Sequence, residues 1–154
     1  MSPRAACRLA TLGFAQVYDY LPGKVDWLAR NLPVAGSDAD APTIGRLLRH
    51  EVVTAAPDTS VADVRARVAA SPHGFALVTT PDGVLLGRLR GTQLDAADPE
   101  TSAGDAMAAG PSTLRPHEPV AAVRERLTGR NLAHAIVTDP DGRLLGTVRT
   151  ADLT

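Results

Sequence analysis

The chain contains one sequence pattern twice. Residues 43–94 align with residues 102–153 without a gap at a constant offset of 59, and about 19 of the 52 pairs are identical. The agreement is clearest around Pro81-Asp82-Gly83 in the first copy and Pro140-Asp141-Gly142 in the second. A tandem repeat of this period indicates that each copy is one supersecondary unit that cannot bury its apolar face alone. We therefore expect the copies to pack on each other about a pseudo-two-fold axis, with the functional site in the groove between them.

Length, charge and cysteine content restrict the class of protein. The 154 residues suffice for one domain with a core, and 16 basic against 17 acidic residues argue against a nucleic-acid surface. No apolar run is long enough to span a membrane, and the amino terminus lacks the apolar core of a signal peptide. The single cysteine, Cys7, excludes an internal disulfide framework and indicates a cytoplasmic protein. Lys24 is the only lysine in this alanine-rich and arginine-rich chain, which is typical of a GC-rich bacterial genome.

Each copy reads as helix, strand, helix, strand, strand, helix. Val61, Val64 and Val68 lie at helical spacing, and the Pro-Asp-Gly turn separates two strand-forming runs. The arginine pairs Arg65/Arg67 and Arg124/Arg126 are interpreted as solvated helix faces. The expected elements are leading helices at 44–49 and 103–109, first strands at 53–54 and near 113, helices along 61–68 and 120–127, and hairpins over 75–89 and 135–148.

Several motifs resemble a pair of CBS motifs, often called a Bateman module. They are Gly104-Asp105-Ala106-Met107, the Pro-Asp-Gly turn, and the trailing Leu145-Gly146-x-Val148-x-x-x-Asp152-Leu153. The resemblance covers about 110 residues and implies an α/β fold in which CBS motifs at 43–95 and 102–154 pack through their sheets. It also implies clefts for adenosine compounds (AMP, ADP, ATP or S-adenosylmethionine) and pairing of two modules into a homodimer.

The family's ligand motif is a Thr followed, after two residues, by an Asp at the start of the last helix. An ionised carboxylate can accept hydrogen bonds from both ribose hydroxyls. Asp152 matches that Asp, but Arg149 replaces the Thr; the first copy has Arg90 and Gln93 at these positions. The resemblance therefore assigns one ligand cleft to Asp152, Arg149, Thr113, His134 and Ala135. It assigns a degenerate second cleft to Gln93, Arg90 and Thr54.

Two alternatives stay open for this cleft. The Arg149 guanidinium can grip a phosphate bidentately or can itself fill the cleft. Asp152 can equally be an ordinary acid at a helix N-terminus, stabilised by the helix dipole.

The leading segment differs in composition from the repeats. Four of the five aromatic residues fall within the first 27 positions, and only Phe75 lies beyond. Residues 2–14 read as a helix with a Gly cap, 15–18 as a strand and 23–28 as the start of a helix, in an order similar to the final third of a rhodanese domain. Residues 1–36 are thus expected to be a truncated rhodanese-like segment, joined by a linker over 33–42. The cysteine nucleophile of that family would precede Met1, and Cys7 is not the matching residue.

The sequence predicts a regulatory or sensory module without catalytic activity. Its alternatives are a ligand-free dimerisation scaffold with degenerate clefts, or the remnant of a rhodanese-CBS sulfurtransferase that lacks its cysteine. The scattered histidines, His50, His73, His117 and His134, have no metal-ligand spacing. We therefore expect no metal and no certain cofactor, with an adenine nucleotide or S-adenosylmethionine as the candidate ligand. The expected partners are a second copy and this ligand, not nucleic acid or membrane.

Overall fold

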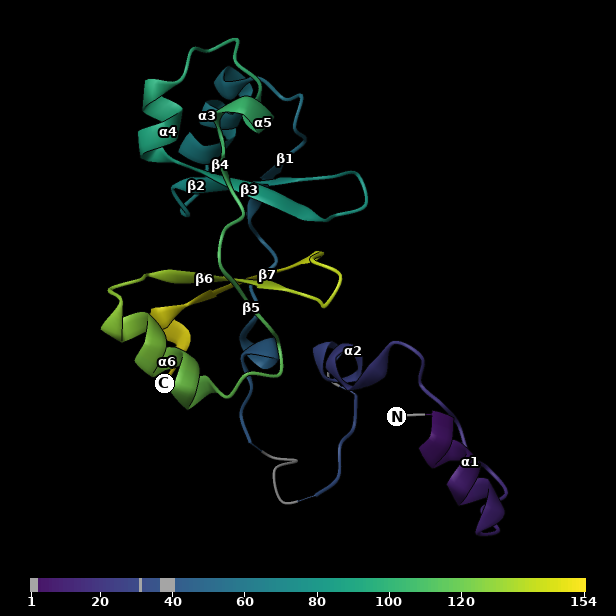
Figure 1. The fold of residues 1–154 in the computed structure, drawn as a ribbon. Coiled ribbons are helices and arrows are strands. Elements are labelled where there is room, and N and C mark those ends of the chain that lie inside the picture. Colours follow the sequence, from purple (N-terminus) through teal and green to yellow (C-terminus); the bar gives the residue numbers. More distant parts are fainter. Residues whose placement is uncertain (1–2, 31, 37–40) are drawn as a thin grey trace.

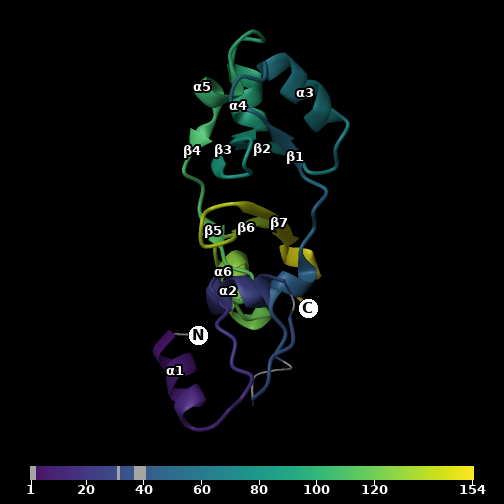
Figure 2. The same cartoon turned by 90° about the vertical axis from the view of Figure 1, so that its right-hand side faces the viewer.

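The computed structural model describes residues 3–30, 32–36 and 41–154. The two repeats build two halves stacked on each other, with their sheets facing inward and their helices on the outer faces (Figure 1). Figure 2 shows the same stack from the side, with α3, α4 and α5 at one end and α6 toward the other. The expected α/β fold with two facing sheets is confirmed.

The first half is a four-stranded sheet of order β1-β2-β3-β4, in which β1 and β2 are parallel and the other neighbours antiparallel. Its outer face packs on α3, which begins where the Ser60 hydroxyl accepts the backbone N–H of Asp63 (3.2 Å). Val61 and Val64 are fully buried against this face because they share one side of the helix. The elements are β1 (Val53–Ala55), α3 (Val61–Ala69), β2 (Phe75–Thr79), β3 (Leu85–Arg90), α4 (Gly91–Ala96) and β4 (Ala108–Ala109).

The second half has a three-stranded sheet of order β5-β6-β7 with the same pattern of parallel and antiparallel neighbours. Val120, Val123 and Leu127 occupy one face of α6 and are buried in its core. The last helix is a 3-10 turn, η2. The elements are β5 (Thr113–Leu114), α6 (Val120–Gly129), β6 (His134–Thr138), β7 (Leu144–Arg149) and η2 (Thr150–Asp152).

The leading helices are exchanged between the halves. The helix η1 (Ile44–Leu47) belongs to the first repeat, but Ile44 is fully buried in the core of the second half. In return α5 (Ala103–Ala106) places Ala103 in the core of the first half. The backbone bonds are symmetric, since Gly45 N–H donates to Pro116 O and Gly104 N–H to Pro57 O, both at 2.8 Å. Each half is therefore completed by the other repeat.

The leading helices are shorter than predicted. The first ends at Leu47 and the second at Ala106. The expected continuation to residue 109 is wrong because Ala108 and Ala109 pair with β3 as strand β4. In the other half Arg49 makes the matching antiparallel bridge to Thr147. These residues therefore form strand-type backbone pairs, although the sequence predicted that they continue the helices.

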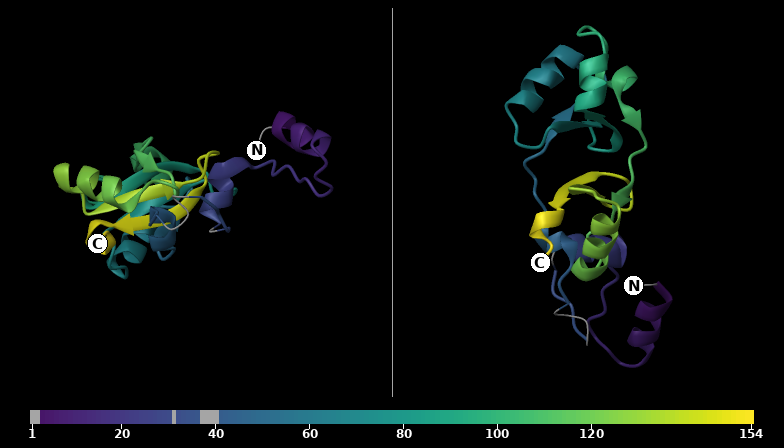
Figure 3. Two further views of the ribbon diagram at one scale, coloured as in Figure 1. Left: turned by 90° about the horizontal axis from the view of Figure 1, so that it is seen from below. Right: turned by 90° about the vertical axis from the view of Figure 1, so that its left-hand side faces the viewer.

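The inner faces of the sheets meet in a small apolar layer. Phe75, Leu77 and Ile136 are buried there. The turn regions of the two hairpins also contact each other. Leu85 N–H donates to Gly142 O (3.0 Å), and Leu144 N–H donates to Gly83 O (2.9 Å). The expected packing of the repeats through their sheets is therefore present, and the halves form a common structure (Figure 3).

The leading segment lies to one side of the second half, with α1 farthest out (Figure 1). It contains α1 (Pro3–Thr11) and α2 (Gly23–Ala29), both predicted. The predicted strand at 15–18 is wrong: these residues form no strand, because no sheet edge lies there to pair with them. The predicted linker includes residues 37–40, which lie outside the described residues. Among the described helices, none combines the length and apolarity that a membrane crossing requires.

Candidate functional site

A cavity of about 430 Å³ lies where the first half faces β5, β6 and α6 of the second. We call it the arginine cavity, because four arginines line it: Arg88, Arg90, Arg126 and Arg130. Its remaining lining consists of Ser112, Thr113, Leu114, Leu127, Leu132, His134, Ala135 and Ile136, so no carboxylate is among the lining residues. Its surface is therefore strongly positive.

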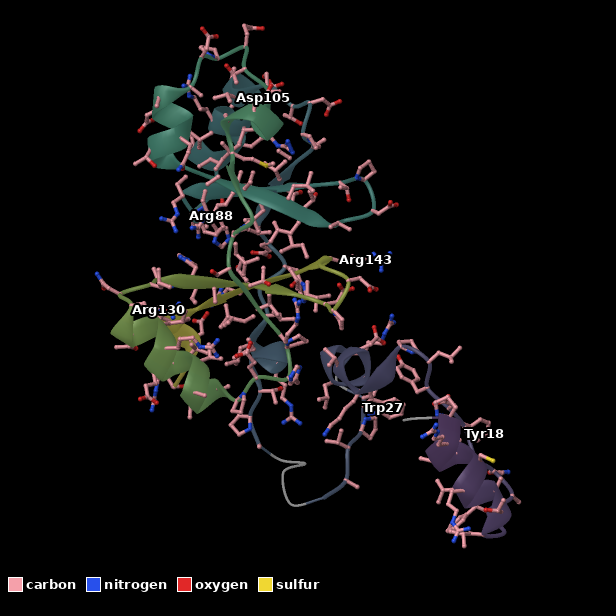
Figure 4. All side chains as sticks on the ribbon, in the orientation of Figure 1. Tyr18, Trp27, Arg88, Asp105, Arg130 and Arg143 are labelled. Atoms are coloured by element: carbon pink, nitrogen blue, oxygen red, sulfur yellow. The ribbon has the colours of Figure 1, made fainter. Side chains whose placement is uncertain are left out.

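Strand β3 supplies the two arginines of the first half. Leu89 is buried in the core of that half, and its neighbours Arg88 and Arg90 project from the other, inner face of the strand. Figure 4 shows Arg88 between the halves, on the same side of the molecule as Arg130. The cavity is thus assembled from both repeats.

Arg88 is the least compensated of these side chains. Its Nε atom is buried and has no hydrogen-bond partner among the described residues. Burial, and then the neighbouring charge of Arg90, lower the pKa of Arg88. Arginine nevertheless stays protonated in proteins, so a half-buried cation is held here without a counter-ion.

A second cavity, of about 680 Å³, adjoins the first at His134. We call it the histidine cavity, because His73 of the first half and His134 of the second both line it, with ring centroids 6.2 Å apart. Arg149 and Thr150 also line it. Burial, followed by the charges of His73 and Arg149, lowers the pKa of His134. Together the cavities join a region that contains two imidazole rings to a strongly cationic one.

Asp152 lines neither cavity. Its carboxylate forms a bidentate ion pair with Arg49, with Nε to Oδ2 at 2.7 Å and Nη2 to Oδ1 at 3.1 Å. The hydrogen bond from Arg49 lowers the pKa of Asp152. Both oxygens that would accept a ribose diol therefore already accept from a guanidinium of the other repeat.

The residues assigned to the second cleft are not gathered into one cavity. Gln93 uses its Oε1 to accept the backbone N–H of Arg90 (3.0 Å), which caps α4. The carbonyl oxygen of Thr54 accepts from Arg67 Nη2 (2.8 Å). Only the Arg90 side chain reaches a cavity, and this is the arginine cavity.

The structure brings together part of the predicted ligand set. Thr113, His134 and Ala135 line the arginine cavity, and Arg149 with His134 lines the histidine cavity. The sequence interpretation missed Arg88 and Arg130 altogether, although each is a charged residue where the other repeat has a small one, Thr147 and Ser71. This asymmetry between the copies was the available signal.

The interpretation of the helix arginines as solvated faces is wrong at one position and incomplete at another. Arg65 is partly buried, and its Nη2 donates to Ala97 O at 2.7 Å beyond the end of α4. Arg126 lines the arginine cavity while it also forms an ion pair with Glu118.

Other reactive groups lie apart from the cavities. Cys7 is exposed on α1. Within the part of the chain that the structure describes, no three His, Cys, Asp or Glu side chains gather as a metal site would require.

The fold has known relatives. It is similar to the CBS domains of a transcriptional regulator from Streptococcus pneumoniae, with a TM-score of 0.67 and 20% identity over 74% of this chain and 98% of that one. The cytosolic domain of the Mg²⁺ channel MgtE in complex with ATP gives a TM-score of 0.66 and 23% identity over 75% of this chain and 49% of that one. The chain therefore spans about half the length of that structure.

A third similar structure is CBSX2 in complex with AMP, with a TM-score of 0.65 and 21% identity over 72% of this chain and 92% of that one. A comparison with curated protein sequences finds no match. In sequence, residues 103–154 match the CBS domain family. Residues 103–154 are thus similar to the CBS domain family, and the whole repeat pair has the fold of CBS-pair proteins.

Proposed function

We propose that the chain is a regulatory module that binds an adenosine-containing ligand between its two halves. The observation that carries the proposal is the pair of adjoining cavities that meet at His134, one lined by two imidazole rings and the other by four arginines. An adenine nucleotide has the same division, with a flat base at one end and phosphates at the other. The similar structures in complex with ATP and AMP support this ligand class.

The base fits the histidine cavity, which is lined by the His73 and His134 rings and by Arg149. The phosphates fit the arginine cavity, beside Thr113 and Ala135. Asp152 becomes a ribose acceptor only when Arg49 releases it. The cleft assigned to Gln93, Arg90 and Thr54 takes no ligand in this proposal, since Gln93 is engaged in capping.

A ligand in this position contacts both halves. It would tie Arg88 of the first half to α6 of the second and so favour one arrangement of the two sheets. A ligand shifts a conformational equilibrium by its difference in affinity for the two arrangements. The module therefore acts through shape and not through catalysis.

The leading segment belongs to the same proposal. Residues 1–36 lie outside the match to the CBS family, and we assign them to the C-terminal part of a rhodanese-like domain. Cys7 takes no part in sulfur transfer, because it lies within a helix and not in an anion-binding loop. Leu12, Phe14, Tyr18 and Leu21 expose large apolar side chains there. Such a surface favours association into a homodimer.

A dimerisation scaffold without ligand is the second candidate. The observation in its favour is the Arg49–Asp152 ion pair, which occupies the carboxylate that the family uses for ribose. This candidate predicts an intact fold and dimer with no response to nucleotides.

A thermal-shift panel of AMP, ADP, ATP, adenosine and S-adenosylmethionine separates the two candidates. A ligand at about 100 times its dissociation constant stabilises the fold by about 2.7 kcal/mol, which raises the melting temperature by several degrees. We expect that rise with at least one nucleotide. If none shifts the melting temperature at millimolar concentration, the scaffold replaces the sensor.

A further inference from the structure

We infer that the arginine cavity is a binding site for a chain of two or more linked phosphate groups, and that these phosphates, not the ribose or the base, dominate recognition. The inference rests on the proposed function and narrows its ligand class. The shared chemistry is a phosphoanhydride chain, which either a nucleoside polyphosphate or inorganic polyphosphate can supply.

The charge of the lining is the first argument. Arg88, Arg90 and Arg130 have no acidic partner among the described residues, and only Arg126 is partly neutralised, by Glu118. Guanidinium groups bind phosphate oxygens bidentately, and hydroxyl donors such as Thr113 can add to them. Three cations around one space are matched better by the charge of a phosphate chain than by that of a single phosphate monoester.

The burial of Arg88 is the second argument. A buried N–H donor without an acceptor is costly, and its Nε atom is such a donor. The matching position in the second repeat is Thr147, which is completely buried. Arg88 thus stands where the other repeat buries a small side chain. An anion that accepts hydrogen bonds from its guanidinium would explain this difference.

The asymmetry of the repeats is the third argument. Arg90 and Arg126 have arginine counterparts, Arg149 and Arg67, but Arg88 and Arg130 correspond to Thr147 and Ser71. Four arginines therefore converge on one side of the pseudo-two-fold axis only. A general surface charge would give no such difference between the copies.

The volume of the arginine cavity and the position of Asp152 outside it indicate which ligands the cavity can bind. The cavity of about 430 Å³ is more than ten times the roughly 30 Å³ that one water molecule occupies, so a phosphate chain fits. Asp152 lies outside it and is held by Arg49, so no free carboxylate selects for a ribose. The cationic sulfonium of S-adenosylmethionine is repelled by this lining.

Calorimetric titration of the whole chain at constant ionic strength tests the inference. The probes are adenosine, AMP, ATP and inorganic tripolyphosphate, with sulfate and an oligoglutamate peptide as charge controls. We expect affinity to rise from AMP to ATP, tripolyphosphate to bind within about tenfold of ATP, and adenosine and both charge controls to bind far more weakly.

The variants are Arg88→Gln and Arg130→Ser, with Arg124→Gln as the matched control on α6. Arg124 is exposed and does not line the cavity. Losing a charge-assisted partner should weaken tripolyphosphate binding by about tenfold or more. Arg130 is also exposed, so Arg130→Ser should leave the melting temperature unchanged even if Arg88→Gln affects folding.

The outcomes separate the inference from the function on which it rests. If adenosine binds as well as ATP while tripolyphosphate does not bind, the inference is wrong and the proposed function stands. If neither nucleotide nor tripolyphosphate binds, both fail. Two further results would overturn the inference by showing that the cavity attracts anions without specificity. One is an equal loss of tripolyphosphate affinity in Arg124→Gln and Arg130→Ser. The other is oligoglutamate binding as tight as tripolyphosphate binding.

Discussion

Arg49 and Asp152 lie at opposite ends of the repeat pair and form a bidentate ion pair. In the proposed function this ion pair controls whether the carboxylate can accept a ribose. Neither residue has a charged counterpart in the other repeat, where Ala108 and Gln93 stand. Such a bidentate pair has fixed geometry, and both carboxylate oxygens are occupied. Binding of a ribose therefore competes with an internal contact.

Arg49→Gln should release Asp152 and raise the affinity for AMP several-fold. The physical reason is that the Asp152 carboxylate no longer has to break an ion pair with Arg49 before it can bind the ligand. Calorimetry of AMP against 2′-deoxy-AMP measures the effect, because only the former offers a diol. Arg46→Gln is the control, since Arg46 is exposed and makes no ion pair among the described residues. An unchanged AMP affinity in Arg49→Gln would show that Asp152 does not bind ribose.

The lowered pKa of His134 predicts that the stability of the structure depends on pH. Its folded-state pKa lies below the ordinary value of 6.5, chiefly because the ring is partly buried. The unfolded chain then binds the proton more readily, so stability is complete above about pH 6.5 and falls as the pH drops toward the folded pKa. The pKa of Asp152 is lowered from 3.8, so loss of its contribution belongs to a more acidic range.

His134→Phe should remove this loss between pH 7.5 and pH 5.5. The substitution introduces the side chain that the first repeat carries at the matching position, Phe75. Urea unfolding of both proteins across the range measures the difference. A variant that loses as much stability as the wild type on acidification would assign the dependence to other groups.

At the scale of elements, the exchanged helices approach the opposite half through glycine. A Cβ on Gly45 would lie 3.0 Å from Pro116 O, and one on Gly104 would lie 3.2 Å from Pro57 O. The same glycines donate the backbone hydrogen bonds that dock each helix. The close approach therefore depends on the missing side chain.

Gly45→Ala and Gly104→Ala should each lower the free energy of unfolding by about 1–3 kcal/mol, because the helix must move away from a backbone carbonyl. Gly129→Ala at the end of α6 is the control, since a Cβ there meets no atom within 4 Å. It should be neutral or should stabilise by up to about 1 kcal/mol. Urea titration gives all three values, and a neutral Gly45→Ala would contradict the tight docking.

The elements also show how far the sequence could lead. The strand β2 and the turns at Gly83 and Gly142 follow from local patterns, because β2 is an apolar run whose hairpin partner β3 lies directly beyond the turn and because glycine readily adopts the positive φ of both turns. The strand predicted at 15–18 and the end of the helix predicted at 103–109 failed because strands need an edge to pair with. The exchange of helices is invisible to a repeat alignment, which does not say which core each copy completes.

The site was predictable to a similar extent. The repeat and the CBS resemblance located the groove between the copies and placed Thr113, Ala135 and His134 near it. They did not reveal that Arg49, 103 positions away, engages Asp152, because that contact depends on the tertiary fold. Arg88 lies in a strand whose inner face becomes evident only when the sheets are assembled.

At the scale of the whole molecule, the leading segment and the stacked halves differ in how much they bury. Helix α1 buries no residue, whereas η1 places Ile44 at the centre of the second half. The boundary of the stable unit therefore lies before η1 and not at the first repeat's own strands.

Deleting residues 1–34 should change the free energy of unfolding by less than about 1 kcal/mol, a shift below about 8 °C in melting temperature. Deleting residues 1–50 should be far more damaging, since truncating a buried isoleucine alone typically costs about 2–5 kcal/mol. Calorimetry compares the two. Light scattering of the shorter deletion also tests whether the exposed apolar segment holds a homodimer together; a dimer that survives the deletion would place the contact elsewhere.

The exchange of leading helices has a consequence for assembly. A protein with a single repeat would expose its own leading helix and leave its core without one. Two such molecules could satisfy each other by the swap that now occurs within one chain, as the matching bonds of Gly45 and Gly104 illustrate. Within one chain the exchange is tethered and independent of protein concentration. The two copies also need not be identical, and the arginines gather on one side of the repeat pair only.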